Sequence, residues 1–179
     1  MVSRFIAGRT LEPADLRDPA RLVQVVALLR RCHHAMPALL AAPLPQFDVF
    51  AVLRAYVADL QARSGHLLQQ RLTGLVMLAG QLEAAVAPMP VVFGHNDLLA
   101  ANLIDDGERL WLIDWDYAGL SHPLFDLANL STNNGLDSGL DAQLVGYYLG
   151  DAPTPGLMAS LRAMQTASLL REVLWAAVS

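Results

Sequence analysis

The sequence lacks several residue types and patterns, and each absence limits the kind of protein it can encode. It contains no lysine, because all twelve basic residues are arginines. It contains no Gly-x-Gly either, so a glycine-rich loop around nucleotide phosphates is not expected within it. The single cysteine, Cys32, excludes an internal disulfide and is typical of a reducing, cytoplasmic location.

Long apolar runs are absent as well. The longest charge-free stretch in the N-terminal half lies between Arg31 and Asp48, and two histidines and three prolines interrupt it. No segment is therefore predicted to span a membrane. The first residues also lack the apolar run of a signal peptide, so none is expected.

What the sequence does contain is apolar and locally acidic. Hydrophobic residues make up 54% of its 179 residues and charged residues 16%, which predicts one folded domain over residues 1–179. From Asp97 to Asp151 there are ten acidic residues and one basic residue, Arg109. Such a field disfavours nucleic acid and favours a metal ion or a cationic substrate. A solvated acidic face is the alternative interpretation.

Hydrophobic periodicity predicts a mainly helical domain with a few short strands. Residues 3–11 are expected to form an extended piece and a turn. Short signals mark where the helical stretches begin and end. Asp18-Pro19 is an example of a helix start, and Asn133-Asn134-Gly135 is an example of a helix end. The six predicted helices cover residues 19–36, 48–64, 67–86, 123–130, 140–149 and 156 to near the end of the chain.

A short β-hairpin is predicted near the middle of the chain. Asp106-Gly107 separates two apolar runs, and this dipeptide is a strong signal for a tight turn between antiparallel strands. Asn102 directly precedes the first strand, and Asp114 directly follows the second. Both side chains are therefore expected at the open end of the hairpin, and the loop that carries Asp97 leads to the same end.

These three residues have the chemistry that phosphoryl transfer requires. The reaction needs a carboxylate to orient and deprotonate the attacking hydroxyl, a role that suits Asp97. It also needs oxygen ligands for Mg²⁺, a role that suits Asn102 and Asp114. The order His-x-Asp-x4-Asn, hairpin, Asp is the spacing of a kinase catalytic loop followed by its metal-binding aspartate. His95 in this pattern is expected to fix the loop backbone.

The stretches GHNDLLAANLI and LIDWDYAGLSHPLFDLANLSTNNG resemble the choline/ethanolamine kinases, within the wider aminoglycoside phosphotransferase-like group. The resemblance extends over nearly all of the chain. It implies the C-terminal lobe of a protein-kinase-like fold, with His95 and Asp97 in the catalytic loop and Asn102 and Asp114 as metal ligands. It further implies that Asp126 is a buried brace accepting hydrogen bonds from that loop; an ordinary acid in a first helical turn is the alternative.

The sequence also departs from the family pattern. The family binds ATP between two lobes, and its N-terminal lobe supplies a phosphate-covering loop and a lysine. Neither feature is present in this chain. The expectation is therefore a C-terminal lobe without its ATP-binding lobe, inactive alone. It would need that missing lobe or another chain as a partner, and it could form a homo-oligomer.

The substrate residues carry weaker signals. Aromatic faces and carboxylates hold quaternary ammonium groups. Trp175 matches a tryptophan of the family's choline pocket, and Asp116 and Tyr117 lie beside Asp114 in the sequence. Core packing is the alternative for Trp175 and Tyr117. Arg171 and Glu172 are further candidates for the rim of the pocket.

Three classes of function remain open from the sequence. The first is an ATP- and Mg²⁺-dependent kinase of a small alcohol, choline or ethanolamine foremost, with an aminoglycoside or another small molecule as the runner-up. The second is a non-catalytic binding module that keeps the kinase fold. The third is a metal-dependent hydrolase that uses His95, Asp97, Asp114 and Asp116.

Overall fold

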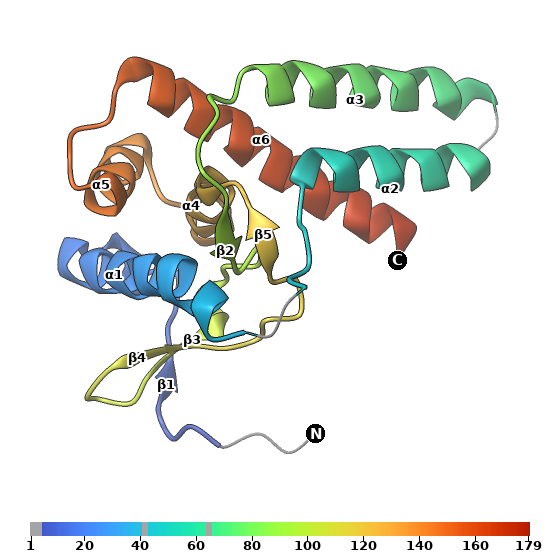
Figure 1. The fold of residues 1–179 in the computed structure, drawn as a ribbon. Helices are drawn as coiled ribbons and strands as arrows, with labels where there is room; N and C mark the ends of the chain where they lie inside the picture. The colour runs from blue at the N-terminus through green and yellow to red at the C-terminus, as the bar shows by residue number, and fades with distance from the viewer. Residues whose placement is uncertain (1–4, 41–42, 64–65) are drawn as a thin grey trace.

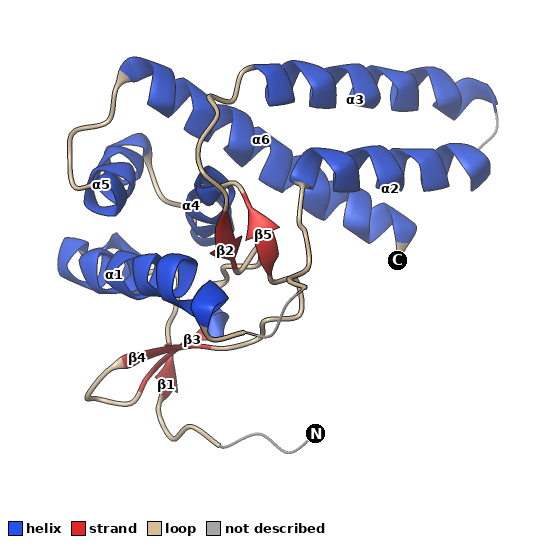
Figure 2. Cartoon of the chain, in the orientation of Figure 1, coloured by secondary structure: helices blue, strands red, loops and turns tan. Residues whose placement is uncertain are grey.

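The computed structural model describes residues 5–40, 43–63 and 66–179 (Figure 1). The described part is mainly helical, as the sequence predicts (Figure 2). Its α-helices are α1 (Pro19–Ala35), α2 (Val49–Arg63), α3 (His66–Ala84), α4 (Pro123–Asn134), α5 (Ser138–Leu149) and α6 (Pro155–Val178). Its strands are β1 (Arg9–Thr10), β2 (Val92–Gly94), β3 (Leu103–Asp105), β4 (Leu110–Leu112) and β5 (Gly119–Ser121).

The helix ends follow the predicted capping signals. The Asp18 carboxylate accepts a hydrogen bond from the amide of Ala20, and Pro19 occupies the first turn of α1. Helix α4 runs four residues beyond the predicted Leu130. Its extension is stabilised by Asn134, whose side-chain amide donates to the Leu130 carbonyl at 2.7 Å. Gly135 then ends the helix with a φ of 64°.

The predicted hairpin is present as β3 and β4, with Asp105 paired to Leu110. Asp106 organises the turn, because its carboxylate accepts hydrogen bonds from the amides of Glu108 and Arg109. Strand β1 lies antiparallel to β3, which gives the predicted extended piece a partner. A second sheet joins β2 to β5 and was not predicted, since Gly-Leu-Ser is too short to show a strand pattern.

Helix α4 lies at the centre of the fold. Helix α6 packs against both α4 and α2, while α2 and α3 form an antiparallel pair at one side (Figure 1). Every residue from Pro123 to Ser131 is buried, which explains why α4 reads as almost continuously apolar. Among the described residues, no helix is long and apolar enough to cross a membrane. Four polar residues of α4 are buried with the apolar ones: Asp126, Asn129, Ser131 and Asn134. Three of them contact the loop that follows β2.

Candidate active site

The loop of residues 95–102, here called the 95–102 loop, is held by Asp126 of α4. This carboxylate is fully buried and accepts hydrogen bonds from the backbone amides of His95, at 2.7 Å, and Asn96, at 2.6 Å. Asn96 adopts a φ of 65°, a left-handed conformation that non-glycine residues rarely take. The two hydrogen bonds help to stabilise this conformation one residue before Asp97.

Two further residues of α4 hold the same loop. The side-chain oxygen of Asn129 accepts a hydrogen bond from the Leu98 amide, and that of Asn134 accepts one from the Ala100 amide at 2.9 Å. Asp126, Asn129 and Asn134 are spaced so that they share one side of the helix. The sequence reasoning did not single out the two asparagines. The two asparagines are five positions apart, which is neither an i,i+3 nor an i,i+4 spacing, so no local pattern in the sequence singles them out.

His95 connects the 95–102 loop to the end of the hairpin. Its Nε2 lies 2.8 Å from the carbonyl oxygen of Ile113, and its Nδ1 accepts a 3.3 Å hydrogen bond from the Asp97 amide. These partners assign the ring proton to Nε2, because a carbonyl can only accept. The ring also lies edge-on to Trp115. The imidazole is thus buried and bonded to backbone on both sides, in a position that fixes the loop relative to Asp114.

Asp97 is half-buried in the same loop. Burial raises the pKa of its carboxyl above the ordinary value, whereas the nearby Arg171 and His95 act to lower it. No described residue donates a hydrogen bond to this carboxylate. Its oxygens can therefore accept a proton from, or orient, a hydroxyl brought to the site.

The structure places Asn102 and Asp114 at the open end of the hairpin. The Ile113 amide donates to the Asn102 carbonyl at 3.0 Å, which joins the two strands one residue before Asp114. The side-chain nitrogen of Asn102 donates to the Asp97 carbonyl, also at 3.0 Å, and its oxygen is the atom left for a ligand. Asp114 is exposed and has a φ of 63°. Its charge also acts to raise the pKa of Asp97.

This donor set fits a hard divalent cation. The Asn102 amide oxygen and the Asp114 carboxylate are oxygen ligands, and Mg²⁺ commonly takes one or two such ligands together with waters and phosphate oxygens. Among the described residues, no group of three or more His, Cys, Asp or Glu side chains converges to hold a metal. Asn102 and Asp114 are thus the two oxygen donors that this end of the hairpin offers, and the described residues do not contain the further histidines that a metal-dependent hydrolase would use beside them.

Arg171 is a buried residue, 3% exposed, that contacts the 95–102 loop and does not lie at a pocket rim. Its Nη1 donates to the carbonyl oxygen of Asn96 at 2.8 Å, and its guanidinium lies 4.7 Å from the centre of the Tyr117 ring. One face of Tyr117 is thus covered by a cation of the protein itself. Tyr117 is 37% exposed and Trp175 is 44% exposed, so neither is an ordinary core residue. No described hydrogen bond or ring contact joins Trp175 to Asp116 or Tyr117.

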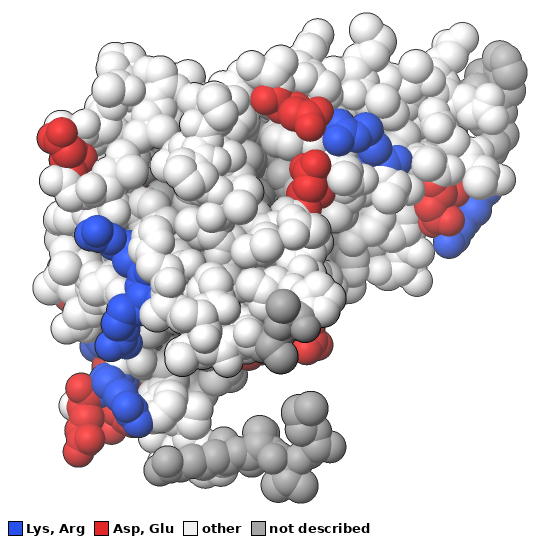
Figure 3. All heavy atoms as spheres, in the orientation of Figure 1, with Lys and Arg blue, Asp and Glu red and all other residues white. Residues whose placement is uncertain are grey.

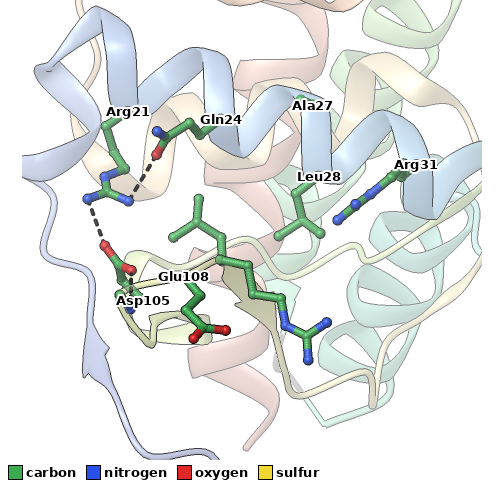
Figure 4. Close-up of a pocket in the computed structure, with 10 residues that line it drawn as sticks. Arg21, Gln24, Ala27, Leu28, Arg31, Asp105 and Glu108 are labelled. Atoms are coloured by element: carbon green, nitrogen blue, oxygen red, sulfur yellow. Dashed lines mark hydrogen bonds and ion pairs between the residues drawn. The ribbon is translucent and has the colours of Figure 1, made fainter.

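A separate pocket of about 470 Å³ lies between α1 and the turn of the hairpin (Figure 4). Arg21 crosses one end of it and pairs with Asp105 at 2.7 Å, while Leu28 and Arg31 line it from α1 (Figure 4). The turn is the opposite end of the hairpin from Asn102 and Asp114, and none of the predicted site residues lines this pocket. The face shown in Figure 3 carries its charged side chains mainly towards the edges, and the pocket's arginines and acids belong to α1 and the hairpin.

Known proteins resemble this chain both in sequence and in fold. The model of the phosphotransferase enzyme family matches residues 1–163. A probable ethanolamine kinase of Arabidopsis thaliana is 33% identical over 141 residues, which cover 72% of this chain and 36% of that protein. The chain thus spans about a third of the length of this curated relative.

Solved structures resemble the whole described fold. A choline/ethanolamine kinase family protein from Mesorhizobium loti has a TM-score of 0.81 and 26% identity, covering 99% of this chain and 61% of that one. A structure of LicA in complex with AMP has a TM-score of 0.76 and 17% identity, covering 98% of this chain and 59% of that one. The second likeness shows the fold alone. Together they confirm the predicted kinase-like lobe, matched to about three fifths of each solved chain.

Proposed function

Since this chain belongs to the phosphotransferase enzyme family, we propose that it is the catalytic lobe of an ATP- and Mg²⁺-dependent kinase of a small cationic alcohol, choline or ethanolamine. The observation that carries the proposal is the half-buried Asp97 carboxylate, which no described residue engages by a hydrogen bond. It stands in a loop fixed by hydrogen bonds from α4, next to the oxygen ligands Asn102 and Asp114.

In this proposal Asp97 is the general base and its backbone is held still. The attacking hydroxyl donates to the Asp97 carboxylate, which orients it and takes its proton as the phosphoryl group moves. Burial raises the pKa of this carboxyl, which makes it a better proton acceptor once it is ionised. His95 and Asp126 take no proton from the substrate; they hold the loop in the geometry described above.

Asn102 and Asp114 would hold Mg²⁺ through their side-chain oxygens. When bound, the ion would neutralise charge on the nucleotide phosphates. The lysine and the glycine-rich loop of the kinase pattern are missing from these 179 residues. An N-terminal lobe or another chain would have to supply them, so we expect the chain by itself not to transfer phosphate.

A cationic acceptor accords with the charge around the site. The segment from Asp97 to Asp151 is strongly acidic, and the partly exposed Tyr117 and Trp175 offer aromatic surface to an ammonium group. Asp116 would supply a further carboxylate. The relatives named above are a probable ethanolamine kinase and a protein of the choline/ethanolamine kinase family. We place the protein in the cytoplasm and give it neither a nucleic-acid partner nor a membrane partner.

The proposal is tested by phosphoryl transfer from ATP in the presence of Mg²⁺, with choline, ethanolamine and an aminoglycoside as separate acceptors. Both the 179-residue chain and the full product of its gene would be assayed. Turnover of choline or ethanolamine is expected with the full product alone. Asp97→Ala should lower turnover by about 10² to 10⁴, the usual contribution of a general base.

The outcomes separate the candidate functions. An Asp97→Ala variant with unchanged turnover would remove Asp97 from the mechanism. Phosphorylation of the aminoglycoside without that of the amino alcohols would favour the runner-up substrate. Glu108→Ala, at the far turn of the hairpin, is the matched control and should leave turnover unchanged. Asn102→Ala and Asp114→Ala should instead raise the Mg²⁺ concentration needed for half-maximal rate.

A further inference from the structure

A buried hydrogen-bonded chain reaches the 95–102 loop from α5, on the far side of α1. The hydroxyl of Tyr148 on α5 lies 2.7 Å from Nδ1 of His33 on α1, and Nε2 of His33 lies 2.8 Å from the Asp126 carboxylate. Asp126 in turn accepts from the amides of His95 and Asn96. All three side chains are buried. The chain therefore links three helices to the loop that carries Asp97.

The proton positions in this chain follow from its chemistry. Burial by itself would raise the pKa of Asp126, but hydrogen bonds from His33 and from the two loop amides hold it below its ordinary value. The carboxylate is thus ionised and can only accept, so Nε2 of His33 must carry a proton. In a neutral ring Nδ1 is then bare and accepts from the Tyr148 hydroxyl. Burial, with the Asp126 charge nearby, raises the pKa of Tyr148 to about 12, which keeps that hydroxyl protonated.

We propose that Tyr148 is a positioning residue, which acts through His33 and Asp126 to hold the backbone of the 95–102 loop. By donating to Nδ1 it favours the same ring tautomer that the Asp126 carboxylate requires, the one that carries its proton on Nε2. The hydrogen bond from Nε2 fixes the orientation of the Asp126 carboxylate. Its two oxygens can then accept hydrogen bonds from the amides of His95 and Asn96. Without the hydroxyl, Nδ1 of a neutral ring is left buried without a donor, which weakens the preference for the Nε2–H tautomer and with it the hydrogen bond to Asp126.

The neighbouring Tyr147 provides a matched control. It lies on the same helix, is only partly buried, and directs its hydroxyl to the side chain of Gln143 at 3.3 Å. Removal of its hydroxyl leaves every member of the buried chain in place. The inference rests on the proposed function only in treating the 95–102 loop as catalytic, because the hydrogen bonds exist whether or not the chain phosphorylates an alcohol.

The test is NMR spectroscopy of the 179-residue chain with ¹⁵N-labelled histidine and backbone. In the unmodified protein, the ¹⁵N shifts of His33 should show the proton on Nε2, and the amides of His95 and Asn96 should resonate far downfield, as hydrogen bonds to a carboxylate require. Tyr148→Phe should shift the His33 tautomer population towards Nδ1–H and move both amide resonances upfield. Tyr147→Phe should change neither.

Two results would overturn the inference. One is a neutral His33 that carries its proton on Nδ1 in the unmodified protein, a measurement that requires no variant to fold. The other is a folded Tyr148→Phe protein in which the His33 tautomer and both loop amides are unchanged. Loss of kinase activity in the full gene product, with the hydrogen bonds intact, would count against the proposed function and leave this inference standing.

Discussion

The guanidinium of Arg171 donates a 2.8 Å hydrogen bond to the carbonyl oxygen of Asn96, the residue before Asp97. This contact joins the last helix of the chain to the 95–102 loop across 75 positions of sequence. It also places a buried positive charge next to the proposed general base. The ionisation of Asp97 therefore depends on a residue of α6 as well as on its own loop.

Removal of this charge should raise the pKa of Asp97. Burial already raises that pKa, and Arg171 opposes the effect by favouring the ionised carboxylate. In Arg171→Met the opposing charge is gone, so the carboxyl should titrate at higher pH, as followed by ¹³C NMR of labelled aspartate. In an active full-length enzyme the acid limb of the rate profile should move to higher pH.

Arg162→Met is the control for this change. Arg162 lies on the same helix, is exposed, and forms no ion pair among the described residues. Its removal should leave the Asp97 titration where it was. If Arg171→Met also left the pKa of Asp97 unchanged, the prediction that Arg171 lowers this pKa would be wrong.

Asp126→Asn should destabilise the fold and loosen the 95–102 loop together. The substitution removes a buried charge that accepts from His33, His95 and Asn96, and the loss of one partner in such an arrangement costs about 3 kcal/mol. Because the folded pKa of Asp126 lies below its unfolded value, its contribution is present above the unfolded pKa. It is lost as the pH falls through the folded pKa.

Chemical denaturation at neutral and at acidic pH measures both effects. The difference in unfolding free energy between the wild type and Asp126→Asn should shrink as the pH falls below the ordinary range of a carboxyl group. Asp59→Asn, which breaks the exposed pair with Arg63, should cost no more than about 1 kcal/mol. If Asp126→Asn lowered the free energy of unfolding by no more than Asp59→Asn does, the role of Asp126 in stabilising the 95–102 loop would be contradicted.

Gly94→Ala should be destabilising, whereas Gly80→Ala should not. A methyl group at Gly94 would clash with the hydroxyl oxygen of Ser121 and lie 3.0 Å from the Asn96 side-chain oxygen and 3.2 Å from that of Asp126. The Ser121 hydroxyl and the Asn96 side-chain oxygen are buried without a hydrogen-bond partner in the described structure. A methyl group cannot donate a hydrogen bond to either atom, so it adds crowding without satisfying them. Overpacking of this kind costs about 1–3 kcal/mol.

Gly80 provides the comparison on α3. A methyl there meets nothing within 4 Å, and alanine in a helix interior is favoured over glycine by about 0.5–1 kcal/mol. In thermal unfolding, the melting temperature should therefore fall for Gly94→Ala and rise for Gly80→Ala. An unchanged or raised melting temperature in Gly94→Ala would show that the space around Asp126 is not as tight as the structure describes.

The sequence by itself determined the helices, the hairpin and the core of the proposed site. Local signals carry these features: Asp18-Pro19 begins a helix, Asp106-Gly107 turns a hairpin, and the spacing of Asp97, Asn102 and Asp114 places them around one loop and one open end. Each depends on backbone preferences over a few residues, which a sequence pattern can report. The specific roles of these residues in catalysis and metal binding remain predictions.

Only the tertiary structure decided what holds that loop in place. Side chains of α4 and α6 bond the loop backbone directly, and Asp126 of α4 is held in turn through His33 of α1 and Tyr148 of α5, which are 115 positions apart. These residues come together because apolar packing brings the four helices together. His33 and Tyr148 show no pattern in the sequence that sets them apart from other helix residues, and Arg171 was only a candidate for the rim of a substrate pocket. Their hydrogen bonds depend on distances between distant elements, which no local pattern in the sequence encodes.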